Sequence, residues 1–293
     1  MKKMLLVLNA YAGTKKANKI LPELIAIFNR ADYDVMTYIT DVDGAKNYVA
    51  AKASQVDLVV CCGGDGTFNE TVSGILEAGA TTPIGYIPTG STNDFAGSLG
   101  LPLDPKKAAQ RIIDGTPCAY DVGTFGGRIF TYVASFGAFT KTSYSTPQSV
   151  KNLLGHTAYV LSGISEITQI KKLPVRMELD GETVDGDYIF GAISNSTSIG
   201  GILSLDPSQV DMADGLFEVM LVSSPKDLGQ LAECLTAVQK QQYDNCAMIT
   251  FRTAKQIRVY CDGSFNWTLD GEMEPGKVQV EVENLHRAIS LMK

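Results

Sequence analysis

The sequence lacks any apolar run of roughly 18 or more residues, so we expect no segment that spans a bilayer. Its first apolar run, residues 4–8, is too short for the core of a signal peptide, and a polar turn without a small-residue cleavage site follows it. We therefore interpret this run as a buried first strand.

Side chains that bind metals through nitrogen or sulfur are also scarce. The only two histidines are His156 and His286, and none of the six cysteines are spaced as C-x-x-C. This argues against a structural zinc site. Cys61 and Cys62 are adjacent inside an apolar run, where thiols behave as small core hydrophobes. These features favour a reduced, cytoplasmic protein.

Positive charge is not in excess. The chain has 25 Lys and Arg against 32 Asp and Glu, a formal net charge of −7. This balance argues against a nucleic-acid partner and against simple electrostatic adhesion to an anionic membrane. The Walker pattern G-x-x-x-x-G-K-[ST] is absent, as are the Gly-rich loop and H-R-D motif of protein kinases. The chain is therefore neither a P-loop enzyme nor a protein kinase.

What is present, up to about residue 121, is a regular alternation of strand and helix signals. This rhythm predicts an α/β fold with a doubly wound, mostly parallel sheet. Asp43 or nearby Asp41 is expected to cap the second helix, and Asp104 the last. We predict strands at 3–9, 34–40, 56–64 and 83–88, and helices at 17–32, 43–54, 68–79 and 104–115.

After about residue 121 the pattern becomes β-rich, which predicts a mostly antiparallel second domain. Helices are predicted at 149–170 and 224–245, and the strands are expected at 128–139, 174–179, 187–196, 216–224, 247–253, 256–261 and 277–284. We place the first domain at 1–121 and the second at 122–285. The last residues, about 286–293, are candidates to return to the first domain.

The strongest motif is G-G-D-G-T-F-N-E, residues 63–70, between an apolar strand and a helix. Two glycines at the end of a strand let the backbone approach a ligand closely, and the following helix amino terminus offers N–H groups to an anion. Asp65 is then held at the sheet edge, and Thr67 either caps the helix or contacts phosphate. The alternative is a tight turn in which Asp65 is only a cap. Ligands of open α/β sheets bind at this edge, which favours function.

Three further polar turns should lie on the same edge. They are residues 9–16, Thr40, and residues 88–97. In the last of them Asn93 and Asp94 could bind a nucleotide or orient Asp65. Lys15 either binds phosphate or is simply solvated. The candidate nucleotide-binding residues are Asn9, Ala10, Tyr11, Ala12, Gly13, Thr40, Gly63, Gly64, Asp65, Gly66, Thr67, Phe68, Asn69, Gly90, Ser91, Thr92 and Asn93.

The combination of G-G-D-G-T-F-N-E, P-T-G-S-T-N-D-F-A and a later L-D-G-E resembles the diacylglycerol kinase catalytic family. Here the first turn reads N-A-Y-A-G where that family usually has N-P-x-x-G. The resemblance implies a nucleotide domain followed by a β-sandwich, with the active site between them. It also implies an ATP- and Mg²⁺-dependent lipid kinase, with diacylglycerol as the leading acceptor. A NAD kinase and a non-catalytic nucleotide-binding regulator stay open as alternatives.

The tetrapeptide L-D-G-E occurs twice, at 179–182 and 269–272. Asp180 and Gly181 predict a two-residue hairpin turn, which makes Glu182 structural. The second copy has its turn signal later, at 274–276, so Asp270 to Glu272 need not form the turn. The family resemblance implies that Glu272 is the general base that accepts the proton of the substrate hydroxyl.

Two metal roles are expected. Asp65 is the candidate to orient the catalytic Mg²⁺ or the phosphates. Spacing alone predicts only a solvated turn for the loop that contains Asp211 and Asp214. The resemblance implies instead a structural magnesium held by Asp211, Asp214 and the carbonyl of Leu216.

The acceptor site is the least defined part. The helix predicted at 149–170 has an apolar side that suits core packing, a lipid cleft or a membrane surface. A lipid acceptor implies transient, peripheral contact with the membrane by a cytoplasmic enzyme. The sequence does not decide the oligomeric state, although an edge strand of the β domain could pair with a second copy in a homodimer.

Overall fold

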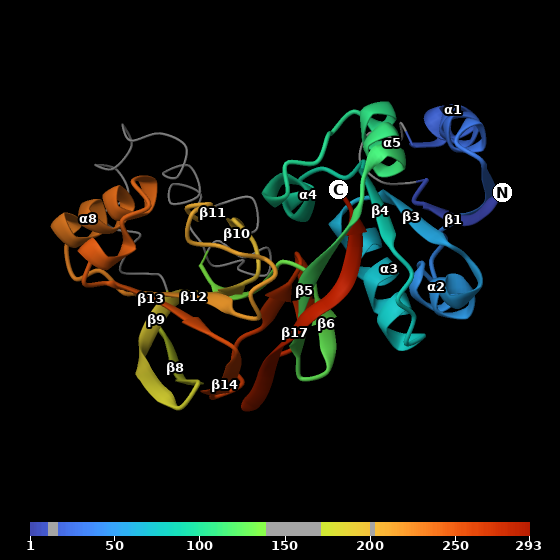
Figure 1. The fold of residues 1–293 in the computed structure, drawn as a ribbon. Helices are drawn as coiled ribbons and strands as arrows, with labels where there is room; N and C mark the ends of the chain where they lie inside the picture. Colours follow the sequence, from blue (N-terminus) through green and yellow to red (C-terminus); the bar gives the residue numbers. More distant parts are fainter. Residues whose placement is uncertain (11–16, 139–170, 200–202) are drawn as a thin grey trace. The chain divides into compact units, whose positions relative to one another are not determined.

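The computed structural model describes residues 1–10, 17–138, 171–199 and 203–293, and these divide into two compact units (Figure 1). Unit 1 comprises Met1–Val122 and Leu285–Lys293, and unit 2 comprises Gly123–Asn284. Strands β5 and β17 each begin in one unit and end in the other. No helix of the described residues is long and apolar enough to cross a membrane.

Unit 1 is a parallel sheet with helices on both faces (Figure 1). The strand order is β2-β1-β3-β4, and the end of β17 pairs parallel to β4. Its elements are β1 (Lys2–Leu8), α1 (Ala17–Arg30), β2 (Tyr33–Ile39), α2 (Lys46–Lys52), the 3-10 helix η1 (Ala53–Gln55), β3 (Leu58–Gly63), α3 (Asp65–Glu77), β4 (Ile84–Pro88), α4 (Asp94–Ser98), α5 (Pro105–Asp114) and β5 (Pro117–Phe125).

Continuous apolar runs form the central strands of unit 1 because both sheet faces are covered. All six residues of β3 are buried. Helices α1 and α5 pack on one face, and α2 and α3 cover the other (Figure 1). On the first face Leu24 and Phe28 of α1 and Ile112 of α5 meet alternate side chains of β1 and β3.

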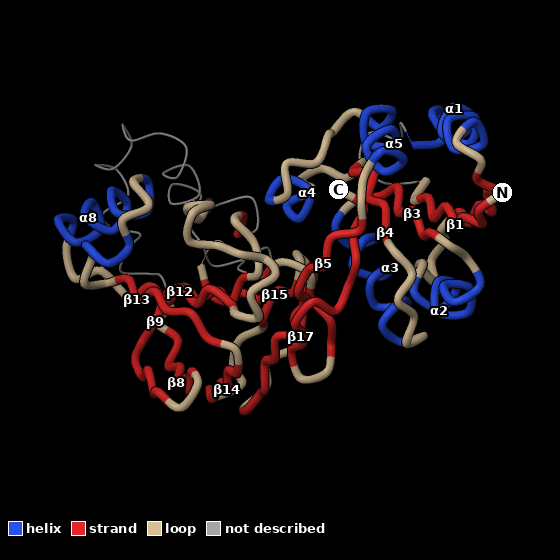
Figure 2. Tube along the Cα trace, viewed as in Figure 1, coloured by secondary structure: helices blue, strands red, loops and turns tan. Residues whose placement is uncertain are grey.

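Unit 2 consists mainly of strands, which are red in Figure 2, and these strands pair antiparallel. The order is β16-β15-β7-β9-β8-β14-β17, and β12 pairs with β9 and β13. Its elements are β6 (Arg128–Phe130), β7 (Val133–Gly137), β8 (Leu173–Leu179), β9 (Glu182–Ser194), β10 (Ser198–Ile199), β11 (Leu203–Ser204), β12 (Phe217–Ser223), α8 (Leu228–Gln239), the 3-10 helix η3 (Tyr243–Asn245), β13 (Ile249–Ala254), β14 (Gln256–Cys261), β15 (Trp267–Leu269), β16 (Glu272–Glu274) and β17 (Gln279–Met292).

Alternation of apolar and polar residues gives unit 2 one buried sheet face. In β8 every second residue, from Leu173 to Leu179, is buried. Trp267 is fully buried, and its ring lies 4.7 Å from that of Phe125 and 4.8 Å from that of Phe136. The predicted fold class, a parallel α/β unit followed by a mostly antiparallel β-sandwich unit, is confirmed.

One helix start differs from the sequence prediction. Helix α2 begins after Ala45 without a side-chain cap, and Asp41 instead accepts a hydrogen bond from the Asp43 N–H. The N–H of Ala45 donates to Glu70 of α3 at 2.8 Å. The prediction that Asp41 or Asp43 caps this helix is therefore wrong, because a residue distant in sequence supplies the acceptor. Asp104 caps α5 as predicted, accepting from Lys106 and Lys107.

Candidate active site

The polar turns of unit 1 leave one edge of its sheet. Leu8 is in register with Ile39 and Cys62, and Cys62 with Ile87, so β1 to β4 end side by side. Hydrogen bonds continue the sheet by one residue: Asn9 N–H donates to the Cys62 carbonyl, and Thr40 N–H to the Leu8 carbonyl. The order β2-β1-β3-β4 puts the topological switch point between β1 and β3, where ligands of such sheets bind.

Two of these turns are in direct backbone contact. A Cβ atom at Gly90 would lie 2.5 Å from the Gly64 Cα atom, and one at Gly64 would lie 3.1 Å from the Gly90 Cα atom. Neither position tolerates a side chain without a shift of the main chain. The G-G-D-G-T turn and the turn after β4 therefore pack main chain against main chain at two half-buried glycines.

Helix α3 begins at Asp65, after Gly64, and no side chain caps it. Its first N–H groups have no helical acceptors, which suits them to bind an anion. The suggestion that Thr67 caps this helix is wrong, because its hydroxyl accepts from the Asn9 side-chain amide at 3.0 Å. Phe68 is fully buried against Tyr86, so its side chain serves the core.

Asp65 joins the first of these turns to the second. Its carboxylate accepts hydrogen bonds from the Thr92 hydroxyl and the Asp94 N–H at 3.2 Å, and from the Phe95 N–H at 3.4 Å. The side chain is 7% exposed. Burial, and to a smaller degree the charge of Asp94, raises the pKa of Asp65 despite the opposing hydrogen bonds from Asp94, Phe95 and Thr92.

The turn after β4 is closed by Asn93. This residue has a φ of 55°, and its side chain accepts from the Gly90 N–H and donates to the Gly90 carbonyl. Ser91 and Thr92 are exposed on the same turn. Tyr11, Ala12, Gly13, Lys15 and His156 lie outside the described residues.

In unit 2 the second L-D-G-E forms a two-residue hairpin turn between β15 and β16. Leu269 pairs with Glu272, and Asp270 and Gly271 have φ values of 49° and 86°. The later turn signal at 274–276 suggested that Asp270 to Glu272 need not form the turn, but Asp270 and Gly271 do form it. The first copy makes the same turn between β8 and β9, with φ values of 49° and 97° at Asp180 and Gly181.

The aspartates of both turns accept hydrogen bonds from backbone N–H groups, but one is buried and the other is exposed. The Asp270 carboxylate is buried and accepts from the N–H groups of Thr131, Tyr132 and Val133 and from the Thr131 hydroxyl. The Asp180 carboxylate accepts from two N–H groups, those of Lys255 and Gln256, near solvent. Each aspartate therefore ties its turn to a neighbouring strand end.

The glutamates of the two turns differ in their partners. Glu272 is 62% exposed, and its Oε2 atom lies 2.7 Å from Nη2 of Arg128. Arg128 also binds Glu274 at 2.8 Å. Glu182 is exposed, and no hydrogen bond or ion pair of this side chain occurs within the described residues.

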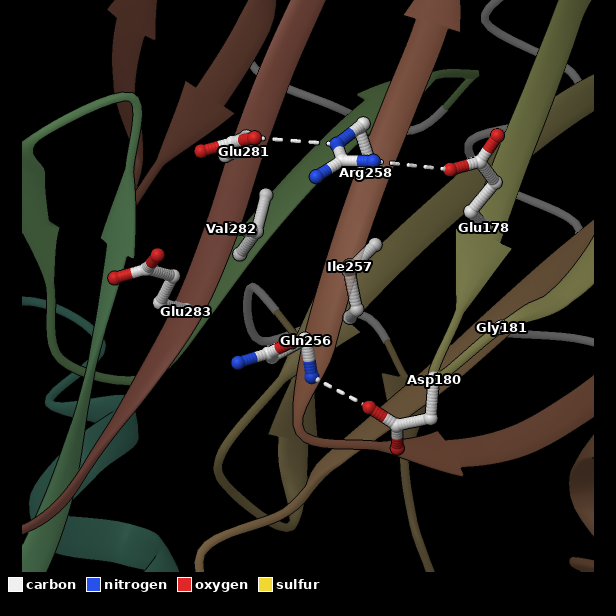
Figure 3. A pocket seen from close by; sticks show the side chains of 9 residues that line it. All are labelled: Glu178, Asp180, Gly181, Gln256, Ile257, Arg258, Glu281, Val282 and Glu283. Atoms are coloured by element: carbon white, nitrogen blue, oxygen red, sulfur yellow. Dashed lines mark hydrogen bonds and ion pairs between the residues drawn. The ribbon is translucent and has the colours of Figure 1, made fainter.

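The first copy also borders a groove of about 560 Å³ on the exposed face of β8, β14 and β17. Figure 3 shows Arg258 between Glu178 and Glu281, with Asp180 bonded to the main chain of Gln256. None of the predicted nucleotide, metal or base residues line this groove.

The loop with Asp211 and Asp214 precedes β12. Each aspartate accepts an N–H of its own loop, from Ala213 and Leu216 respectively, and both are exposed. The Leu216 carbonyl accepts from the side chain of Asn284. Within the described ranges, no cluster of three or more His, Cys, Asp or Glu side chains has metal-binding geometry.

Sequence reasoning missed two polar contacts that only the folded chain brings together. Arg128 meets Glu272 across 144 residues, and Asp121, which is fully buried, accepts from the Arg287 N–H at 2.6 Å and lies 3.1 Å from His286. The strand patterns give no indication of these partners. A carboxylate inside an otherwise apolar strand was the available signal for Asp121.

Comparison with known proteins decides the family. Residues 3–125 match the model of the diacylglycerol kinase catalytic domain, and residues 135–293 match that of the YegS C-terminal NAD kinase beta sandwich-like domain. A diacylglycerol kinase of Bacillus subtilis (strain 168) is 30% identical over 295 residues, covering 100% of this chain and 96% of the relative. The chain belongs to the diacylglycerol kinase family.

Other members agree over the same extent. A diacylglycerol kinase of Staphylococcus epidermidis is 30% identical over 292 residues, covering 99% of this chain and 92% of the relative. The crystal structure of a proposed diacylglycerol kinase from Bacillus anthracis str. Sterne has a TM-score of 0.80 at 26% identity, covering 99% and 95% of the two chains. This kinase therefore transfers phosphate from ATP to an alcohol group, and the resemblance drawn from its motifs is confirmed.

Proposed function

We propose that this kinase transfers the γ-phosphate of ATP to the hydroxyl group of diacylglycerol, which yields phosphatidic acid and ADP. The observation that carries the proposal is a likeness over the whole chain to kinases named for this acceptor.

The triphosphate is expected at the carboxyl edge of the unit 1 sheet. Gly64 and Gly90 have no side chains to cover their main chain there, and α3 presents an amino terminus without a side-chain cap. The exposed hydroxyls of Ser91 and Thr92 supply further donors. The proposed nucleotide-binding residues are those predicted from the sequence.

Magnesium fits the same edge. Asp65 and Asp94 are both buried carboxylates whose charges repel each other, so a divalent cation would offset the repulsion that contributes to the raised pKa of Asp65. Asp65 would hold the ion through its waters. When bound, magnesium supplies charge neutralisation to the phosphates.

Glu272 is proposed as the general base. The acceptor oxygen attacks the γ-phosphorus, the bond from that phosphorus to the β,γ-bridging oxygen breaks, and ADP leaves with the bridging oxygen. The hydroxyl proton passes to the carboxylate of Glu272. The buried carboxylate of Asp270 holds the turn that presents this side chain. No phosphorylated enzyme is required.

The loop with Asp211 and Asp214 is proposed to hold a second, structural magnesium together with the Leu216 carbonyl. Glu218 lies close behind it, is 2% exposed, and has an Oε2 atom without a hydrogen-bond partner. Burial, with smaller effects from the charges of Asp214 and Asp211, raises the pKa of Glu218 to about 8. A cation in this loop would offset that concentration of negative charge.

A lipid acceptor requires apolar surface near the base. Met273, next to Glu272, is a large apolar side chain that is 56% exposed. We propose that the acyl chains approach over this residue during transient contact of a cytoplasmic enzyme with the membrane surface.

The test offers labelled ATP and magnesium with diacylglycerol in mixed micelles, with NAD, or without acceptor. We expect label in phosphatidic acid only. Label in NADP would establish a NAD kinase, and nucleotide binding without transfer would establish a regulator. Either result would overturn the proposal.

The role of Glu272 is tested with the matched pair Glu272→Ala and Glu182→Ala. The first should lower turnover by about 10²- to 10⁴-fold with ATP binding nearly unchanged, because a general base contributes about that factor. The second, at the same position of the same turn, should be close to neutral. The reverse pattern would exchange the roles of the two copies.

A further inference from the structure

One arginine distinguishes the two identical turns. Glu182 and Glu272 are each the first residue of the strand that returns from an Asp-Gly turn. Only Glu272 has a cationic partner among the described residues, the guanidinium of Arg128, at 2.7 Å. The tetrapeptide and its backbone conformation are the same in both turns, so the difference lies in what the rest of unit 2 brings to them.

Besides Glu272, the guanidinium of Arg128 binds Glu274 and the Met273 carbonyl. Its Nη1 atom lies 2.8 Å from Glu274 Oε2 and donates to the Met273 carbonyl at 3.2 Å. Glu274 is 10% exposed, and its other oxygen lies 2.8 Å from Lys277 Nζ. Charges thus alternate along Glu272, Arg128, Glu274 and Lys277, so that each carboxylate meets a cation.

The backbone of Arg128 is anchored as well. Arg128 opens β6 and pairs with Phe125 across a two-residue turn, in which Gly126 and Gly127 have φ values of 55° and 87°. The Gly126 N–H donates to the Glu281 carbonyl at 2.8 Å. The arginine is therefore fixed at its main chain and at one edge of its guanidinium, and the other edge is available to Glu272.

We infer that Arg128 is a positioning residue that holds the carboxylate of Glu272 for proton acceptance. This inference rests on the proposed function, in which Glu272 is the base. Binding through Oε2 leaves Oε1 as the proton acceptor and restricts an exposed side chain that would otherwise sample several rotamers. The planar fork of arginine suits two carboxylates in fixed directions better than the single ammonium of lysine.

Such positioning helps a reaction in which the orientation of the base matters more than its strength. Phosphoryl transfer meets this condition, because its loose transition state needs little help from a strong base and much from positioning. Loss of Arg128 should therefore lower kcat and leave the KM for ATP nearly unchanged.

The chain contains a matched control. The main chain that meets Asp180 begins at Lys255, and Arg252 lies three residues before it, as Arg128 lies three residues before Thr131. The Arg252 guanidinium donates to the Phe251 carbonyl, and the residue is exposed. Arg252→Gln removes the same charge from the same unit without touching either glutamate.

The experiment compares Arg128→Gln, Arg128→Lys, Glu272→Gln, the double variant Arg128→Gln/Glu272→Gln, and Arg252→Gln. Turnover of ATP and micellar diacylglycerol is measured, and each variant is checked for cooperative thermal unfolding. We expect Arg128→Gln to lower kcat about 10- to 100-fold with the KM for ATP within about twofold. Arg128→Lys should be intermediate, because it keeps a charge beside Glu274 but lacks the planar fork that faces the two carboxylates in fixed directions.

The double variant decides how Arg128 acts. If it acts through Glu272, the double variant should be as slow as Glu272→Gln to within about twofold, since effects of residues that work as a unit do not multiply. If the double variant instead loses the product of the two single losses in kcat, Arg128 does not act through Glu272. The same conclusion follows if Arg128→Gln keeps the wild-type kcat while Glu272→Gln is inactive. Either result would overturn this inference but not the assignment of the base. Wild-type turnover by Glu272→Gln would overturn the base assignment and the inference with it.

Discussion

Replacing Asp270 by asparagine should destabilise unit 2 far more than the same change at Asp180. Both residues occupy the second position of L-D-G-E, and both have a φ of 49°. Asparagine tolerates this left-handed conformation about as well as aspartate does. The backbone cost is thus equal in the two variants, and the comparison isolates the carboxylate and its hydrogen bonds.

The expected loss in free energy of unfolding follows from the number of donors that each carboxylate binds and from their burial. Asp270 is 6% exposed and accepts four hydrogen bonds, of 2.6, 2.8, 3.0 and 3.1 Å. Asparagine keeps one of the two carboxylate oxygens and replaces the second with an N–H₂ group. The two donors that bound the second oxygen then face another donor instead of an acceptor. Two buried donors without acceptors cost about 1–3 kcal/mol each, and the lost charge weakens the remaining bonds, so we expect about 3–6 kcal/mol. At the exposed Asp180, water replaces the lost acceptor, and about 0.5–1.5 kcal/mol is expected.

A single intrinsic probe reports on this region. Trp267 is the only tryptophan of the chain, is fully buried, and lies in β15, the strand that leads into the Asp270 turn. Urea unfolding followed by its fluorescence should give a much lower midpoint for Asp270→Asn than for Asp180→Asn. Equal losses for the two variants, or a loss below about 1 kcal/mol at Asp270, would refute the argument that burial sets the worth of these bonds.

Two further predictions concern the nucleotide edge and the acid response. Gly90→Ala should weaken ATP binding at least about tenfold and destabilise unit 1 by about 1–3 kcal/mol, because its Cβ would lie 2.5 Å from the Gly64 Cα atom. Gly97→Ala, whose Cβ meets nothing within 4 Å, should be neutral in both isothermal titration and urea unfolding; equal effects would contradict the backbone contact. Burial acts to raise the pKa of Glu274, but hydrogen bonds and charges from the adjacent cations outweigh it and lower the pKa below its ordinary 4.5. The ionised Glu274 carboxylate therefore stabilises the fold above pH 4.5, and this stabilisation is lost as the pH falls through the lowered pKa. Below pH 4.5 the thermal unfolding temperature of Glu274→Gln should depend less steeply on pH than that of the wild type. Parallel curves for the two proteins would argue against the lowered pKa.

Much of the fold could be predicted because it depends on local patterns. The continuous apolar run of β3 indicates a strand covered on both faces, and the alternation in β8 indicates one covered on a single face. Asp104 before Pro105 marks a helix start whose cap lies within four residues. In each case the residues that determine the structure are neighbours in the sequence, so the pattern carries the information.

The errors arose where the partner is distant. The start of α2 has two aspartates in the right place for a cap, yet its acceptor comes from Glu70 on the next helix. Thr67 stands where a helix cap is expected, yet no side chain caps α3, and the Thr67 hydroxyl accepts from the side chain of Asn9 in another turn. Local patterns predicted that these polar turns leave the same edge of the sheet, but tertiary contacts decide which of their residues hold that edge together.

The two copies of L-D-G-E show the same limit most directly. Sequence pattern distinguished them by a later turn signal, and that distinction was wrong, because both form the same hairpin turn. What differs is the surroundings: a buried aspartate with four donors and an arginine from another hairpin in one case, an exposed aspartate with two donors in the other. A tetrapeptide can encode a turn, but the ion pair of Glu272 depends on Arg128, a residue 144 positions away.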